Sequence, residues 1–367
     1  MRIPDMSEKN GPFPFQMNDR LGIGIVGGGM ISQIAHLPFY LADMRCEVRV
    51  VAESRPSLVR HLSEAMGIKR VVDEPAELYA DPKISAVIII APRPATGPLT
   101  LAALEAGKDV FVEKPMAHTA EQASELVAAA RRNNRLLGVA FMKRYDPGVQ
   151  AAKRELDRLM ASQALGPMLM ARFYDFARDY AHPPPPHKRP EESRLRRFDT
   201  WPTAPDWLPA SRTDDYAWFM NAASHDINLL RFLFQRDLRL LAASAPGPGR
   251  LVATFECDGA PVVFELAKSA SGVWAQGAEF VFEQGRLLLE LPSPMAHDRV
   301  ARAVVFENAS GVRIRELEVE PVWCFKKQAE EFISNLLERR PPLTSGADAL
   351  DDLRLIEAVW RLIFEDD

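Results

Sequence analysis

The chain has 367 residues, of which 47% are hydrophobic and 26% are charged, and its formal net charge is −5. This is the composition of a globular protein of about two domains. The negative charge provides no basic surface for nucleic acid. The three cysteines are far apart in the chain and show no zinc-binding spacing, so we expect reduced thiols and no metal site. No apolar stretch approaches the ~20 residues that span a bilayer, so we expect a cytoplasmic protein without a membrane partner.

The first 20 residues are polar and lack the apolar stretch of a signal peptide. We expect residues 1–20 to form an N-terminal arm. From there to residue 143, short apolar runs alternate with helical stretches. Strands are expected at 23–26, 48–52, 86–91, 110–112 and 137–140. Helices are expected at 31–41, 56–66, 99–106 and 120–133. Continuous apolar strands separated by helices predict that 21–143 is a Rossmann domain with a doubly wound parallel sheet.

The pattern changes in residues 144–367. An amphipathic helix is expected at 148–159, a strand at 168–175 and a helical stretch at 216–234, before several strand-like runs between 238 and 319. Two helices, 325–338 and 347–364, close the chain. This pattern predicts an α+β domain with a large, mainly antiparallel sheet. The Pro- and Arg-rich segment 179–215 is a loop of a length that is usually functional or disordered.

The first strand runs directly into a glycine-rich turn, Gly27-Gly28-Gly29-Met30-Ile31-Ser32. In a dinucleotide-binding turn, Gly27 permits the sharp bend, Gly29 lets the diphosphate approach the backbone, and Ser32 allows close packing of helix on strand. The diphosphate would then lie at the helix N-terminus, where free N–H groups favour negative charge. The preceding strand and the following helix make this turn a specific signal for a dinucleotide.

An acidic residue, Glu53, ends the second strand. Its carboxylate would accept hydrogen bonds from the adenosine ribose and repel a 2′-phosphate, which favours NAD. Ser54 and Arg55 follow directly, and an arginine there accommodates a 2′-phosphate, so NADP stays an alternative.

Other strand ends of the Rossmann domain carry Ala91-Pro92 and Glu113-Lys114-Pro115. In an open α/β sheet, ligands bind outside the carboxyl ends of the strands. Lys114 is therefore aimed at the nicotinamide side of the crevice, where its ammonium group can stabilise a developing alkoxide.

The chain resembles the Gfo/Idh/MocA oxidoreductases from residue 21 nearly to its end. The resemblance rests on the glycine-rich turn, on 105–115 with Glu113-Lys114-Pro115, and on Arg144-Tyr145-Asp146-Pro147, Ser224-His225 and Arg340-Pro341-Pro342. It implies a hydride-transferring dehydrogenase that acts on a sugar, a cyclitol or a related compound. It also implies a cis Lys114–Pro115 bond and a homodimer or homotetramer built through the C-terminal sheet.

By this resemblance, the catalytic residues are Lys114 and His225, the latter as the base that takes the hydroxyl proton. Asn221, Arg144 and Tyr145 are further candidates for substrate binding. In the stretch around His225, however, the chain carries Asn221 and Asn228 where the family has aspartates. An asparagine can position a hydroxyl but cannot act as a base.

Two other functions remain open at this stage: a ligand-sensing regulator without catalysis, and a glycosidase or epimerase that uses transient oxidation by bound NAD. Two tryptophans in the Pro-rich loop, Trp201 and Trp207, either contact a sugar ring or anchor the loop to the core.

Overall fold

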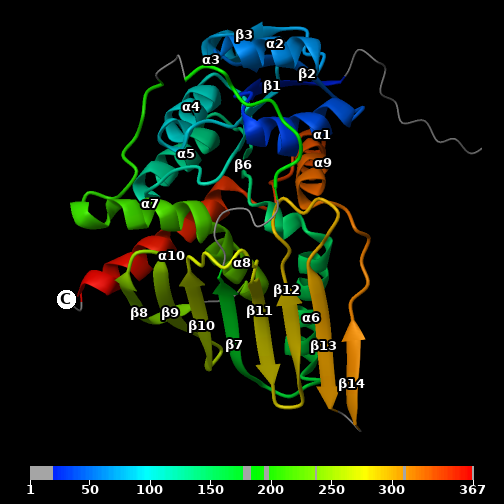
Figure 1. Ribbon diagram of the computed structural model, residues 1–367, viewed down its shortest axis with the longest axis vertical. Coiled ribbons are helices and arrows are strands. Elements are labelled where there is room, and N and C mark those ends of the chain that lie inside the picture. The colour runs from blue at the N-terminus through cyan, green and yellow to red at the C-terminus, as the bar shows by residue number, and fades with distance from the viewer. Residues whose placement is uncertain (1–19, 177–182, 194–197, 236–237, 309–310, 366–367) are drawn as a thin grey trace, which may run out of the picture.

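Six parallel strands form the first sheet, in the spatial order β3-β2-β1-β4-β5-β6 (Figure 1). The structure is a computed structural model that describes residues 20–176, 183–193, 198–235, 238–308 and 311–365. The strands are β1 (Leu21–Val26), β2 (Cys46–Ala52), β3 (Val71–Val72), β4 (Ala86–Ile89), β5 (Asp109–Val112) and β6 (Leu137–Val139). This is the predicted Rossmann sheet. The two-residue β3 was not predicted because it is too short to form an apolar run.

Helices flank the strands of this sheet. They are the π-helical turn η1 (Ser32–His36), α1 (Leu37–Ala42), α2 (Pro56–Glu64), α3 (Pro75–Tyr79), α4 (Arg93–Glu105) and α5 (Ala120–Arg132). Helix α4 begins six residues before its predicted start. Pro94 lies in its first turn, where a missing N–H costs nothing, whereas Pro98 lies inside the helix and does not end it.

Eight strands form the second sheet, in the order β14-β13-β12-β11-β7-β10-β9-β8. They are β7 (Met168–Asp175), β8 (Arg239–Gly247), β9 (Arg250–Cys257), β10 (Ala260–Ala267), β11 (Gln276–Phe282), β12 (Gly285–Glu290), β13 (Arg302–Asn308) and β14 (Val312–Glu316). The sheet is mainly antiparallel, as predicted. Strand β7, the first strand of this sheet in the sequence, lies in its middle and pairs in parallel with β10. The meander β8–β10 lies on one side of β7, and the meander β11–β14 lies on the other.

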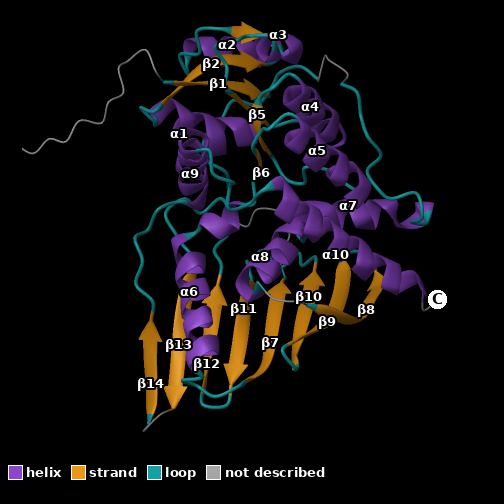
Figure 2. Cartoon of the chain, turned by 180° about the vertical axis from the view of Figure 1, so that it is seen from behind, coloured by secondary structure: helices purple, strands orange, loops and turns teal. Residues whose placement is uncertain are grey.

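Helices α6 (Pro147–Ser162), α8 (Ser224–Phe234) and α10 (Gly346–Glu365) pack on one face of this sheet (Figure 2). No helix of the described residues lies over the opposite face, which is turned toward the viewer in Figure 1. The short helices η2 (Met142–Tyr145), η3 (Ala210–Arg212) and α7 (Thr213–Ala222) complete the second domain between the two sheets. The helical stretch predicted at 216–234 is divided between α7 and α8.

Helix α9 (Cys324–Glu338) returns to the Rossmann sheet, although the predicted boundary at 143/144 assigns it to the second domain. The rings of Phe332 and Phe111 are 4.8 Å apart, and Phe332 is buried with Ile23 and Leu37 in one cluster. Helix α10 contacts both α5 and β8. The last two helices therefore join the two units.

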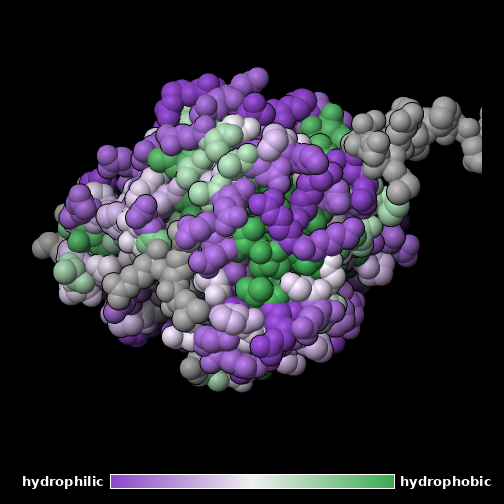
Figure 3. Space-filling model, turned by 90° about the horizontal axis from the view of Figure 1, so that it is seen from above, coloured by the Kyte–Doolittle hydropathy of each residue, from purple (hydrophilic) through white to green (hydrophobic). Residues whose placement is uncertain are grey.

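Seen from above, the molecule is mostly hydrophilic, with an apolar area near the middle of this face (Figure 3).

Within the described ranges, no helix is long and apolar enough to cross a membrane. Cys46, Cys257 and Cys324 are buried free thiols.

Candidate active site

The glycine-rich turn has the geometry that a dinucleotide requires. Gly27 has a φ of +100°, and a Cβ atom there would lie 2.1 Å from the carbonyl oxygen of Ile90, so only glycine fits. At Gly29, by contrast, a Cβ atom would meet nothing closer than an Arg55 nitrogen at 3.8 Å. The space in front of Gly29 is therefore open, as the approach of a diphosphate to the backbone demands.

The helix after this turn begins with a π-helical turn in place of the regular α-helix that was predicted. Ser32 is fully buried there, consistent with close packing of helix on strand. The π turn places His36 against the end of β5, where its Nε2 atom lies 2.8 Å from Glu113 Oε1. π turns occur often at functional sites. This contact ties the first helix to the strand end that carries Lys114.

The acid at the end of β2 is already engaged within the chain. Glu53 is buried, and its Oε2 atom accepts the N–H of Gly28 at 2.9 Å. The guanidinium of Arg55 binds both carboxylate oxygens, at 2.7 and 2.6 Å. Burial opposes the charged form, but these hydrogen bonds hold the pKa of Glu53 below its usual value. The two residues that sequence analysis treats as competing signals for NAD and NADP thus form one ion pair.

A cavity of about 430 Å³ lies between the carboxyl edge of the Rossmann sheet and the second domain. From the Rossmann side it is lined by Ile31, Ile90, Ala91, Arg93, Glu113, Lys114 and Ala140. From the second domain it is lined by Met142, Lys143, Asp175, Trp218, Asn221, Ala222, His225, Trp274, Gln276, Pro294, Met295 and Phe325. The structure thus brings Lys114, His225 and Asn221 together in one cavity.

Lys114 reaches across the domain boundary. Its Nζ atom donates a hydrogen bond to the backbone carbonyl of Asn221 at 2.5 Å and lies 3.4 Å from the Asn221 side-chain oxygen. The Lys114–Pro115 bond is cis, as the family resemblance implies. Burial lowers the pKa of Lys114 to about 8, so the side chain is mostly an ammonium group at neutral pH.

His225 stands in the first turn of α8, with its ring edge-on to Phe141 at 5.8 Å. Its Nδ1 atom is buried without a hydrogen-bond partner among the described residues. Burial, and then the charges of Lys114 and Lys143, hold the pKa of His225 well below its usual value. The imidazole is therefore neutral at neutral pH and can accept a proton.

A buried polar network that sequence analysis missed completes the cavity. Lys143 Nζ lies 3.1 Å from Asp226 Oδ1, and the Gln276 amide donates to the same oxygen at 2.6 Å. The Gln276 amide also donates to Asp175 at 3.0 Å. The only signal in the sequence is adjacency, since Lys143 precedes Arg144 and Asp226 follows His225. Adjacency in the sequence does not show that Asp175 of β7 and Gln276 of β11 lie next to Lys143 and Asp226 in the fold.

Arg144 and Tyr145, expected to bind substrate, lie outside the cavity. Arg144 is buried against α8 and α10, where it pairs with Asp348 at 2.5 Å and donates to the Asn228 carbonyl at 2.9 Å. The Tyr145 hydroxyl lies 3.0 Å from the Thr344 hydroxyl. Both side chains therefore hold the second domain together, because η2 turns them away from the cavity while it turns Lys143 toward it.

Asn228 also faces away, and its amide donates to Asp352 of α10 at 2.7 Å. The two loop tryptophans anchor the loop. Trp201 packs on Gly97 of α4, where a Cβ atom would lie 2.2 Å from its ring, and Trp207 lies under the Arg361 guanidinium at 4.3 Å. Neither lines the cavity.

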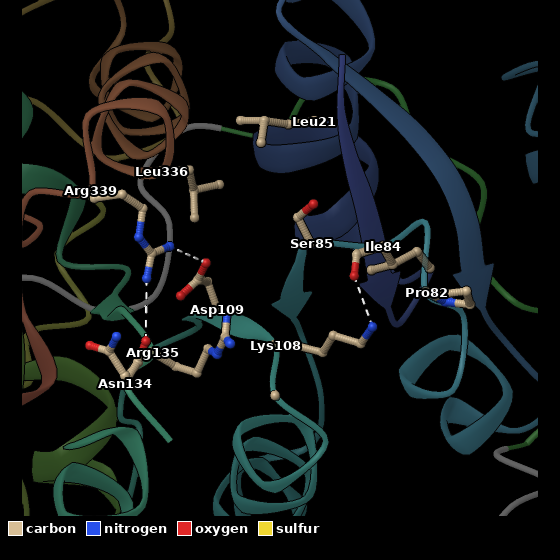
Figure 4. Close-up of a pocket in the computed structure, with 11 residues that line it drawn as sticks. Leu21, Pro82, Ile84, Ser85, Lys108, Asp109, Asn134, Arg135, Leu336 and Arg339 are labelled. Atoms are coloured by element: carbon tan, nitrogen blue, oxygen red, sulfur yellow. Dashed lines mark hydrogen bonds and ion pairs between the residues drawn. The ribbon is translucent and has the colours of Figure 1, made fainter. Parts of the chain in front are cut away.

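A second, wider hollow of about 580 Å³ lies at the amino edge of the Rossmann sheet (Figure 4). Three of its charged groups are engaged within the chain: Lys108 donates to the Ile84 carbonyl at 2.8 Å, and Arg339 pairs with Asp109 at 2.5 Å. Ligands of open α/β sheets bind at the opposite, carboxyl edge. The hollow therefore has no part in the dinucleotide site.

Residues 21–141 match the model of the Gfo/Idh/MocA oxidoreductase family, NAD-binding Rossmann fold. Among curated relatives, the chain is 28% identical over 225 residues to an inositol 2-dehydrogenase of Acidothermus cellulolyticus. That alignment covers 61% of this chain and 56% of the relative. A scyllo-inositol 2-dehydrogenase (NAD(+)) of Bacillus subtilis is 32% identical over 123 residues, which is 34% of each chain. The alignments thus span only about a third to just over half of these relatives.

The likeness to solved structures extends over nearly the whole chain. A levoglucosan dehydrogenase in complex with NADH and levoglucosan superimposes with a TM-score of 0.73 at 19% identity, over 95% of this chain and 98% of that one. A 3-ketoreductase from Actinomadura kijaniata in complex with TDP-benzene and NADP gives a TM-score of 0.69 at 20% identity, over 94% and 98%. At these identities, the superpositions establish the two-domain fold.

The buried network leads to a prediction about Lys114. The Asp226 carboxylate favours the ammonium form of Lys114, and Lys143 opposes it. Asp226→Asn should therefore lower the pKa of Lys114 below about 8. NMR titration of dimethylated lysines would measure this pKa, with the Lys114 signal assigned by its loss in Lys114→Arg. Asp214→Asn, on the exposed side of α7, is the matched control and should leave the pKa unchanged. An unchanged or raised pKa in Asp226→Asn would contradict the electrostatic account.

Proposed function

We propose that the protein is an NAD(P)-dependent dehydrogenase of the Gfo/Idh/MocA oxidoreductase family, whose NAD-binding model residues 21–141 match. Its substrate is a secondary alcohol or ketone of a sugar, a cyclitol or a related compound. The observation that carries the proposal is the meeting of Lys114 and His225 in one cavity at the carboxyl edge of the sheet. The names of the relatives, which are inositol and levoglucosan dehydrogenases, support the substrate class.

The residues present fit a dinucleotide. The open space at Gly29 accepts a diphosphate, and the free N–H groups at the start of the following helix favour its charge. Glu53 lies where the adenosine ribose would bind. When bound, the nicotinamide supplies the hydride acceptor or donor. We propose NAD as the preferred cofactor, with NADP as the alternative.

The cavity residues have distinct roles in alcohol oxidation. The Lys114 ammonium donates a hydrogen bond to the reacting oxygen and stabilises negative charge on it. Neutral His225 takes the hydroxyl proton. Asn221 holds the Lys114 ammonium by its backbone carbonyl and positions substrate without transferring a proton. In the reverse direction, the protonated His225 returns the proton to the oxygen.

We also propose a homodimer or homotetramer that pairs the open faces of the second sheet. Leu241, Val252 and Ile314 are exposed large hydrophobic residues on strands of this sheet, and monomers rarely leave a broad apolar face uncovered. The sheet also carries surface ion pairs such as Arg172–Glu265, so the face is more polar than the sequence predicts. Reduced cysteines are typical of a cytoplasmic protein, which is the location we propose.

The function is tested by a screen of monosaccharides, inositols and glycosides with NAD and with NADP, read as release of reduced cofactor. We expect a sugar or cyclitol substrate. His225→Ala and Lys114→Ala should each lower kcat by at least about 10², the usual loss on removal of a general base or of a donor that stabilises developing negative charge. Asn221→Ala should mainly raise KM. Leu343→Ala, at an exposed position, is the control. Cofactor binding without release of reduced cofactor would favour a sensor or a transient-oxidation enzyme.

The pH profile of kcat/KM follows from the two pKa shifts. Lys114 acts as an ammonium group, so activity should fall as pH rises through about 8. His225 acts as a neutral base with a depressed pKa, so the acidic limb should lie below the usual histidine value. Lys114→Arg keeps its charge throughout this range and should lose the alkaline limb. If the alkaline limb persists in Lys114→Arg, it reports the titration of a group other than Lys114.

Light scattering tests the assembly. We expect the mass of a dimer or a tetramer at micromolar concentration, because pairing buries the exposed apolar residues of the sheet. Ile314→Arg should weaken assembly, whereas Met44→Arg, an exposed position on the Rossmann domain, should not. A monomer of the native chain would overturn the proposal.

A further inference from the structure

A segment of the second domain crosses the cofactor side of the Rossmann domain. Residues 183–193, within the Pro-rich loop, pass next to the glycine-rich turn and the start of α2 (Figure 1, green). The segment is held at one point by Gln33, whose side chain accepts from the Lys188 N–H at 2.8 Å and donates to the Lys188 carbonyl at 3.1 Å. Gln33 also donates to the Gly28 carbonyl at 2.8 Å. The segment is thereby fastened to the dinucleotide turn itself.

The second point of attachment is the N-terminus of α2. Glu192 Oε1 accepts the backbone N–H of Ser57 at 2.9 Å, and Glu192 Oε2 accepts the Ser57 hydroxyl at 2.5 Å. The neighbouring Glu191 N–H donates to that hydroxyl at 3.1 Å. Because α2 starts with Pro56, which has no N–H, the Ser57 N–H is the first one the helix offers. A carboxylate of the second domain thus occupies the anion-binding end of a nine-residue helix.

NADP differs from NAD by a phosphate on the 2′-oxygen of the adenosine ribose. In the proposed site, Glu53 at the end of β2 would bind the ribose 2′-hydroxyl, so a 2′-phosphate would lie beside Glu53, Arg55 and the start of α2. Arg55 is attracted by Glu192 as well as by Glu53. Since Glu53 and Arg55 already neutralise each other as an ion pair, their charges cancel. Glu192 leaves one negative charge among these three side chains.

We propose that Glu192 is a specificity-determining residue, which excludes NADP by occupying the anion position that the 2′-phosphate would take. The inference rests on the proposed dinucleotide site. Glu192 of the second domain places a carboxylate where NADP would place its 2′-phosphate, and two like charges at one position repel each other. Without Glu192, Arg55 and the N-terminus of α2 form a site that accepts a phosphate. Cofactor choice thus depends on a contact between residues 135 positions apart in the chain.

Equilibrium binding of the adenosine halves tests this without turnover. Calorimetric titration of the full chain with 5′-AMP and with 2′,5′-ADP compares ligands that differ only in the 2′-phosphate. We expect the native chain to prefer 5′-AMP. Glu192→Gln should raise affinity for 2′,5′-ADP at least about tenfold, which is ~1.4 kcal/mol, and change affinity for 5′-AMP by less than about threefold. NAD and NADP should follow the same pattern.

Glu191→Gln is the matched control, because it removes one negative charge from the adjacent residue, whose exposed carboxylate pairs with Lys188. It should leave both affinities nearly unchanged. An equal gain in both variants would reduce the effect to general charge and overturn the proposal. So would a native chain that binds 2′,5′-ADP as tightly as 5′-AMP, or a Glu192→Gln variant that gains no affinity for 2′,5′-ADP while 5′-AMP still binds. If neither nucleotide binds any variant, the dinucleotide site fails, and the proposed function fails with it.

Discussion

The hydrogen bond from Lys114 to the Asn221 backbone carbonyl is the interaction on which the site depends. It joins the carboxyl end of β5 to the end of α7, and so brings a Rossmann strand end to the helix pair that carries His225. Parallel strands place their carboxyl ends along one edge, and the second domain is stacked against that edge through α9 and α10. A cavity with chemistry on both walls follows from that arrangement, whereas either domain alone has only half of it.

The electrostatics of the cavity follow from how its charges are buried. Lys114 and Lys143 lie near the carboxylates of Asp226 and Glu113. Burial depresses the pKa of Lys114 although these carboxylates oppose the shift, and burial with the charges of the two lysines keeps His225 neutral. A lysine that remains charged near pH 7 and a histidine that remains neutral are the two states that the proposed alcohol oxidation requires of a donor and a base. This proposed division of roles does not call for a carboxylate at position 221.

Local patterns made most of the fold predictable from the sequence. Strand β7 was predicted at its observed bounds, and the glycine turn was recognised from its residues and context. The cis bond at Pro115 and the shared cavity of Lys114 and His225 were expected from the family resemblance. The features that were not predicted depend on tertiary contacts. Lys143 and Arg144 are neighbours on one short helix, and no periodicity tells which of them faces the cavity. The contacts of Gln276 with Asp226, and of Glu192 with Ser57, join residues far apart in the chain, so only the folded arrangement reveals them.

The central claim is that one interdomain cavity performs the chemistry. A crystal structure of the chain with NAD and a substrate alcohol tests it most directly. The account predicts the nicotinamide ring inside the cavity, with the alcohol oxygen in hydrogen-bond reach of both Lys114 Nζ and the His225 ring, and the adenosine ribose at Glu53. A nicotinamide placed away from Lys114, or a substrate oxygen that His225 does not reach, would contradict it.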